Sequence, residues 1–242
     1  MKLGVKTYSD EKFLEHFKNK ADFFEIQAIR RRHYPFIHKL KKFTKPIVIH
    51  AAHYSQGSNP ADKSLYKQTL ESLNFAKKLA DKTNAKVIVF HPGRLTNKNC
   101  SIDNSINFLK ENFDKRIHIE NLTQIIKSFT TTPDEIKYFL KKTKTKFCFD
   151  VNHAIASANN LNKNPMKTIK EFLKLNPTHF HIGGQKINSK KDTHSSFKKS
   201  TIPIKKILSL YPKTAKITLE VTTSIKDTEF DLDYIKKIIK SI

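Results

Sequence analysis

Histidine and acidic residues recur along the chain at positions from which they could bind divalent metal ions. The polar segment HIGGQKINSKKDTHSSF, residues 181–197, contains three potential ligands, His181, Asp192 and His194. Imidazole and carboxylate groups bind Zn²⁺ in proteins, and they also suit Mn²⁺ and Fe²⁺. A single residue of this kind is more often a satisfied polar group, so the interpretation depends on which other ligands the fold brings to the same place.

Eight short runs of apolar and β-branched residues have the length and composition of β-strands. They cover residues 2–7, 22–28, 46–51, 86–91, 116–121, 146–151, 179–184 and 216–221. Stretches with helical periodicity lie between these runs, and the clearest are residues 62–82, 133–142, 164–175 and 231–242. In the first of these stretches, one face is formed by Leu65, Thr69, Leu73, Ala76 and Ala80.

Strands that alternate with helices, without a linker or a break in composition, predict an α/β fold. We expect a single (β/α)8 TIM barrel that covers residues 1–242. An open, doubly wound sheet is the alternative, but it would place a glycine-rich turn after the first strand, and GVKTYSD provides none. The chain has only five glycines, and no phosphate-binding loop of the P-loop type is present.

The last six of the expected strands each carry a histidine, aspartate or glutamate toward their carboxyl end. These residues are His50, His91, Glu120, Asp150, His181 and Glu220, and His153 follows Asp150 by one helical turn. Because the carboxyl ends of all strands in a barrel meet at one mouth, we expect these residues to converge there with Asp192 and His194. Nine ionisable groups in one place would be costly unless cations neutralised them. The sequence therefore predicts a site for two or three metal ions.

The chain is strongly basic, with 46 Lys and Arg residues against 22 Asp and Glu residues, a formal net charge of +24 and a pI near 9.9. A field of this sign concentrates polyanions, of which nucleic acid is the usual one. Many of the lysines, as in LKKTKTK at residues 140–146, could instead only solvate helix surfaces. The charge favours a polyanionic partner but does not indicate which reaction the protein would catalyse.

The sequence has no apolar run of the roughly 20 residues that a membrane-spanning helix needs. Its first residues, MKLGVKTYSDEKF, lack the apolar region of a signal peptide, which predicts a cytoplasmic protein. The two cysteines, Cys100 and Cys148, are far apart and follow no metal-ligand spacing, as expected of reduced thiols.

Six motifs follow one another along the chain in the order VIVFHPG, IHIENLT, FDVNHAIASA, HFHIGG, DTH and ITLEV. This ordered series resembles that of endonuclease IV. These enzymes are zinc-dependent apurinic/apyrimidinic endonucleases of base-excision DNA repair, and they belong to the xylose-isomerase-like barrels. The resemblance runs from the first strand to the last, although the family's HLND motif corresponds to HIGG here. It implies up to three Zn²⁺ ions per chain, with Mn²⁺ as a possible substitute. It also implies hydrolysis of the phosphodiester 5′ to an abasic site in duplex DNA, which leaves a 3′-hydroxyl.

Carried over by position, the resemblance assigns all nine residues to three ions. His50 and His91 would hold the first ion, Asp150, His181 and Glu220 the second, and His153, Asp192 and His194 the third, with Glu120 bridging the first and second. Glu120 and Glu220 are then the expected catalytic residues. Zinc ions would activate water and stabilise the phosphoryl and leaving-group oxygens, so no side-chain nucleophile is required.

The resemblance also suggests residues that contact DNA. Arg31 or Arg32, in the segment IRRRHY, would enter the duplex at the lesion, and either His53 or Tyr54 would serve as an aromatic wedge. Arg94 and the lysines Lys186, Lys190 and Lys191 are further candidates for contacts with the DNA backbone. We expect a monomer, because duplex DNA must reach an open barrel mouth.

Two other functions are compatible with parts of this pattern. A sugar isomerase or epimerase of the same barrel group would use one divalent ion, held by the residues resembling Glu120, Asp150, His181 and Glu220. A non-catalytic, basic nucleic-acid-binding protein would bind DNA with a steep salt dependence and never cut it. Metal analysis separates the two enzymes, since the nuclease binds about three ions and the isomerase about one.

Overall fold

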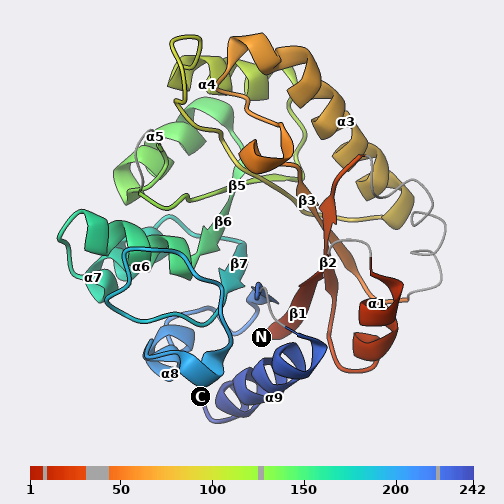
Figure 1. The fold of residues 1–242 in the computed structure, drawn as a ribbon, viewed down its shortest axis with the longest axis vertical. Coiled ribbons are helices and arrows are strands. Elements are labelled where there is room, and N and C mark those ends of the chain that lie inside the picture. Colours follow the sequence, from red (N-terminus) through yellow and green to blue (C-terminus); the bar gives the residue numbers. More distant parts are fainter. Residues whose placement is uncertain (8–9, 31–43, 125–127, 222–223) are drawn as a thin grey trace.

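Eight parallel strands form a closed barrel at the centre of the computed structural model, which describes residues 1–7, 10–30, 44–124, 128–221 and 224–242 (Figure 1). The strands are β1 (Lys2–Thr7), β2 (Phe24–Ala28), β3 (Ile47–Ala51), β4 (Ile88–Phe90), β5 (Ile117–Glu120), β6 (Lys146–Asp150), β7 (His179–Ile182) and β8 (Lys216–Leu219). Each strand pairs with the next along the chain, and β8 pairs with β1. The predicted TIM barrel is confirmed, and the doubly wound alternative is wrong.

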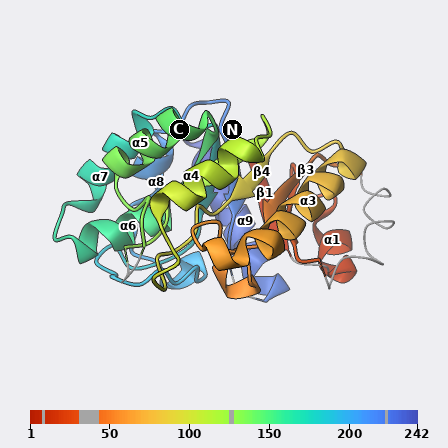
Figure 2. The same cartoon turned by 90° about the horizontal axis from the view of Figure 1, so that it is seen from above.

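Helices surround the barrel on its outside, as the views along and across its axis show (Figures 1 and 2). The described helices are α1 (Glu11–Phe17), α3 (Tyr66–Thr83), α4 (Ile102–Glu111), α5 (Pro133–Thr143), α6 (Val151–Asn160), α7 (Pro165–Leu173), α8 (Ile204–Leu208) and α9 (Ile225–Lys240). Short 3-10 turns cover Tyr54–Gln56, Lys63–Leu65 and Phe197–Lys199. Within the described part of the chain, no helix is both long enough and apolar enough to cross a membrane.

Local sequence signals account for the helix ends. In α5, Thr132 and Glu135 form a reciprocal capping box, and Pro133 occupies the first helical position. The helix expected over 231–242 begins earlier, at Ile225, because the side chain of Ser224 accepts a hydrogen bond from the backbone of Asp227 and caps it there. The apolar face predicted for residues 62–82 is buried at four of its five positions, Leu65 being the half-buried one.

The hydrophobic core has two parts. The larger part lies between the strands and the helices, where Phe149 packs against Phe172 with ring centroids 5.5 Å apart. A second, small cluster of Phe23, Val48, Val87, Val89 and Cys148 is separate from it. Gly4 on β1 makes room for this cluster, because a Cβ there would lie 2.4 Å from the Phe23 ring. The strand ends beyond this cluster carry the ionisable residues.

Candidate metal centre

The structure brings all nine predicted ligands together at the carboxyl ends of the strands. His50, Glu120, Asp150 and His181 lie at or near the ends of their strands, and His91 and Glu220 lie one residue beyond β4 and β8. The shared register of the sheet places Asp150 directly beside His181. Eight of the nine fall into three overlapping groups, within each of which potential ligand atoms lie less than 4.8 Å apart. The ninth, Asp192, contacts two members of the third group.

The first group consists of His50, His91 and Glu120. The Oε2 atom of Glu120 lies 3.2 Å from His50 Nε2 and 3.0 Å from His91 Nε2. The other oxygen, Oε1, lies 3.3 Å from His153 Nδ1 and 3.4 Å from His181 Nδ1. Glu120 therefore faces imidazoles from four different segments, and this is the position expected of a carboxylate that bridges two ions.

The middle group consists of Glu120, Asp150, His181 and Glu220. Three of its buried atoms, Asp150 Oδ2, His181 Nδ1 and Glu220 Oε2, have no hydrogen-bond partner among the described residues. They nevertheless face one another, with His181 Nδ1 2.9 Å from Glu220 Oε2 and 3.9 Å from Asp150 Oδ2. Buried polar atoms normally find partners, so this convergence of unpaired donor atoms fits a metal ion.

The third group joins Asp150 to His153 on α6 and to His194 in the loop after β7. Asp192 Oδ2 lies 3.2 Å from His153 Nε2 and 2.7 Å from His194 Nε2. Asp150 also accepts a hydrogen bond from the backbone of His153, which places that imidazole at the start of α6. The D-x-H pair of the sequence thus meets an upstream histidine, as predicted.

Hydrogen bonds to the second ring nitrogen orient four of the histidines. The Nδ1 atoms of His50, His153 and His194 lie 2.8–2.9 Å from the backbone carbonyls of Ala51, Asn121 and Glu220, to which they donate. Their Nε2 atoms are therefore unprotonated in the neutral ring and face the centre. His181 has the opposite arrangement, since its Nε2 lies 3.0 Å from the carboxylate of Glu25. Such outer hydrogen bonds are the usual support of metal-binding imidazoles.

Burial and neighbouring charges shift the pKa values in opposite directions across the centre. Burial raises the pKa of Asp150 to about 6 and lowers the pKa of His91 to about 4. Burial also opposes the charged form of His194, but the carboxylates of Asp192 and Glu220 raise the pKa of His194 to about 9. A metal ion in the third group would therefore have to displace a proton from this ring.

The first two strands also contribute to the centre, which the sequence reasoning missed. Lys6 on β1 lies with its Nζ atom 2.6 Å from Glu220 Oε1. Glu25 on β2 is fully buried, and its Oε2 atom lies 2.7 Å from Thr218 Oγ1 and 2.9 Å from His179 Nε2 as well as beside His181. The signal in the sequence was the alternation of side chains between the two faces of a strand. In KLGVKT, Lys6 lies on the same face as Gly4, and in DFFEIQA, Glu25 lies on the same face as Phe23.

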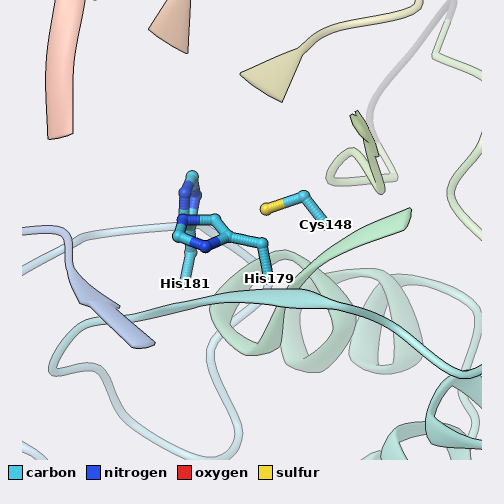
Figure 3. Close-up of side chains that lie close together, drawn as sticks. All are labelled: Cys148, His179 and His181. Carbon is cyan, nitrogen blue, oxygen red and sulfur yellow. The ribbon is translucent and has the colours of Figure 1, made fainter. Parts of the chain in front are cut away.

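His179 and His181 project from β7 to the same side, with the sulfur of Cys148 beside them (Figure 3). Burial raises the pKa of the Cys148 thiol to about 12, so the sulfur is a neutral thiol at physiological pH. His179 hydrogen-bonds the same Glu25 oxygen as His181. We therefore interpret this layer as support for His181 rather than as part of the predicted ligand set.

The loop that carries Asp192 and His194 is fixed at both sides. Gly184 and Ser195 exchange two backbone hydrogen bonds, of 2.8 and 2.9 Å. The buried carboxylate of Asp231 on α9 accepts hydrogen bonds from Ser196 Oγ and from the Phe197 backbone, each of 2.8 Å. The two glycines of HIGG permit this close approach, because a Cβ on Gly184 would lie 2.5 Å from the Ser196 carbonyl oxygen.

Replacement of Gly184 by alanine should therefore displace the loop and weaken the third group. We expect the variant to fold and to bind about one metal ion fewer than the unaltered chain, measured as zinc per protein after dialysis. Ser195→Ala is the matched control, since it removes only a side-chain hydrogen bond to the Gly184 carbonyl. Equal zinc content in the Gly184→Ala variant and the control would contradict the prediction.

The predicted DNA-binding residues have different surroundings. Arg31 and Arg32 lie outside the described residues. His53 stacks on His91, with ring centroids 4.9 Å apart, and Arg94 lies over the ring of Tyr54 at 5.5 Å. Tyr54 is 41% exposed, and Lys186, Lys190 and Lys191 are also exposed. Of the two candidates for the aromatic wedge, Tyr54 is thus the one that faces outward, while His53 packs against the first group.

A closed parallel barrel with imidazoles and carboxylates gathered at its carboxyl mouth defines a TIM-barrel protein with a candidate metal centre. The chain belongs to the xylose isomerase-like TIM barrel family, whose family model matches residues 21–238. The uncharacterized protein MJ1614 of Methanocaldococcus jannaschii is 25% identical over 265 residues, which cover 99% of this chain and 100% of that protein.

Solved structures described as an epimerase-like protein and as an endonuclease share the fold. A D-tagatose 3-epimerase-like protein matches with a TM-score of 0.80 and 21% identity over 100% of this chain and 98% of its own. Endonuclease IV from Thermus thermophilus matches with a TM-score of 0.78 and 15% identity over 100% of both chains. At these identities the likeness concerns the fold, and the choice between activities depends on the residues of the mouth.

Proposed function

We propose that this protein is a metal-dependent endonuclease that hydrolyses the phosphodiester 5′ to abasic sites in duplex DNA and leaves a 3′-hydroxyl. The observation that carries the proposal is the presence of two further ligand groups beside the middle one. An isomerase or epimerase of this barrel needs only Glu120, Asp150, His181 and Glu220, a set that the structure already provides. The first and third groups add four histidine rings and Asp192, which such an enzyme would not require.

Divalent ions held by these groups, Zn²⁺ or Mn²⁺, would act as Lewis acids toward the phosphoryl and leaving oxygens and would lower the pKa of bound water. Two carboxylate side chains of the protein would hold these ions in position. Glu120 connects the first and middle groups, and Glu220 is held on one side by Lys6 and faces His181 on the other. Both carboxylates are at least four-fifths buried, so their positions are set before any substrate binds.

The surface around the mouth supplies features that suit DNA. The exposed ring of Tyr54 and the guanidinium of Arg94 form a stacked pair beside the first group. An aromatic ring of this kind can stack on an exposed base, and the guanidinium can contact a phosphate. With a net charge of +24, the chain would attract the DNA backbone from a distance. A single protein chain is expected to act on the duplex, because the DNA must be able to reach the barrel mouth.

The proposal is tested with a 5′-labelled duplex oligonucleotide that contains one abasic site. We expect the zinc- or manganese-loaded protein to cut this strand once, and a DNA polymerase to extend the new end because it is a 3′-hydroxyl. A chelator should abolish the cut, and added metal should restore it. The same duplex with an intact base is the control substrate. An uncut abasic strand in the presence of loaded protein would refute the proposal.

The variant His91→Ala separates the nuclease from an isomerase. His91 belongs to the first group and to none of the other ligand groups. We expect the substitution to lower incision at least about a hundredfold and to remove about one of the bound ions. A sugar epimerase would keep both its activity and its single ion. His16→Ala on α1 is the matched control, since that histidine pairs with Glu229 outside the centre.

The second candidate is a metal-dependent sugar epimerase. One observation favours it, namely that the middle group alone forms a complete four-ligand set with three unpaired atoms directed inward. The structural likeness to a D-tagatose 3-epimerase-like protein is as close as that to endonuclease IV. Epimerisation of ketohexoses by a chain that retains one ion per molecule, together with intact abasic DNA, would favour this candidate.

A further inference from the structure

A lysine lies inside the candidate metal centre, among groups that otherwise suit cations. Lys6 extends from the carboxyl end of β1, and its side chain is 9% exposed. Its Nζ atom lies 2.6 Å from Glu220 Oε1 and 3.9 Å from Glu25 Oε1. Burial opposes the charged form, but Glu220, Glu25 and Glu120 together raise the pKa of Lys6 above its ordinary value. The centre therefore contains a positive charge that belongs to the protein itself.

Because of the position of Lys6, the two oxygens of the Glu220 carboxylate have different neighbours. Oε1 bonds to Lys6, whereas Oε2 lies 2.9 Å from His181 Nδ1 in the middle group. A metal ion in that group would take Oε2, and the ammonium would stay on the other oxygen of the same carboxylate. Two positive charges on one carboxylate repel each other, and they do so strongly where solvent is largely excluded.

We propose that Lys6 is a fixed cation of the metal centre that weakens metal binding by the middle group and strengthens the binding of an anionic substrate. Lys6 acts through Glu220 on the metal ion and through its charge on the anion. It is therefore a positioning and charge-setting residue. The inference rests on the proposed function for the nature of the anion, a phosphodiester, but its effect on metal affinity depends only on the charges within the centre.

The first test measures Zn²⁺ affinity by competition with a chromophoric chelator. The variant Lys6→Met keeps the length and apolar stem of the side chain and removes the charge, and Lys6→Arg keeps the charge. We expect Lys6→Met to bind one of its Zn²⁺ ions, the one in the middle group, at least about tenfold more tightly than the unaltered chain, and Lys6→Arg to stay near it. The exposed lysine at the other end of the same strand provides the control variant Lys2→Met, which has the same net charge as Lys6→Met.

The second test measures the binding of inorganic phosphate to the zinc-loaded proteins by calorimetry. We expect Lys6→Met to bind phosphate at least about tenfold more weakly, with Lys6→Arg and Lys2→Met close to the unaltered chain. Thermal unfolding of each variant is recorded in parallel, so that a loss of structure is distinguished from a loss of charge. Tighter binding of zinc together with weaker binding of phosphate is a result that a lysine with a purely structural role would not produce.

Unchanged or weaker zinc binding by a folded Lys6→Met variant would overturn the inference, as would phosphate affinity that does not fall. These results are independent of incision, because neither measurement requires turnover. Failure of the unaltered chain to cut abasic DNA would instead tell against the proposed function, while the zinc measurement would still decide the role of Lys6.

Discussion

Replacement of Glu120 by glutamine is expected to abolish incision of abasic DNA and to remove metal from two of the three ligand groups. Glu120 belongs to both the first and the middle group, and its oxygens lie within 3.4 Å of four imidazole rings. Glutamine has nearly the same shape but no charge, and it offers one oxygen in place of two. Loss of the Lewis acid function is worth several kcal/mol, so kcat/KM should fall by about a thousandfold or more.

Two measurements check this result, the rate of cutting and the zinc content of the purified variant. Glu111→Gln is the matched control, since Glu111 is an exposed carboxylate at the end of α4 that contacts Tyr66. We expect the control to retain three ions and full activity. A Glu120→Gln variant that loses activity but keeps all its metal would show that Glu120 acts on the substrate rather than as a bridge between ions.

The barrel could be predicted from the sequence because its strands are marked by apolar runs of regular length and spacing. Each of the eight runs forms a strand, and four of the expected helices are present with shifts at their ends. The runs 179–184 and 216–221 extend past the last strand residues, Ile182 and Leu219. After β7 the chain turns to pair Gly184 with Ser195 in the ligand loop. Contacts between distant segments, which no local pattern contains, decide such ends.

The ligand set could be predicted because a closed barrel brings the carboxyl ends of its strands together at one mouth. Once the barrel is assumed, His50 and Glu120 must lie at the same mouth although they are 70 positions apart in sequence, and the structure places His50 Nε2 3.2 Å from Glu120 Oε2. The supporting residues follow no such rule. The sequence could not show that Glu25 is a partner of His181, because their hydrogen bond crosses the barrel from β2 to β7. The strand alternation of Lys6 was too weak a signal to assign it, since a lysine in a basic chain is usually a solvated surface residue.

Removal of metal is expected to destabilise the protein strongly, because the centre concentrates buried charge. Glu120 and Asp150 are almost completely buried, and unpaired donor atoms face the middle of the group. Ions that bind the folded chain and not the unfolded one add stability by mass action, about 4 kcal/mol for one site at a thousand times its dissociation constant. For a chain of this size that corresponds to roughly 10 °C in Tm.

Scanning calorimetry with excess Zn²⁺ and with a chelator measures this difference directly. The carboxylates of Asp150 and Glu220 should lose their compensating cation in the chelator, while Lys6 partly replaces it at Glu220. The Glu120→Gln variant should therefore show a smaller shift, and Glu111→Gln the full one. If the unaltered protein melts at the same temperature in both solutions, the gathered donor atoms do not hold ions in the folded state, and an apo centre stabilised by its own ion pairs is the correct description.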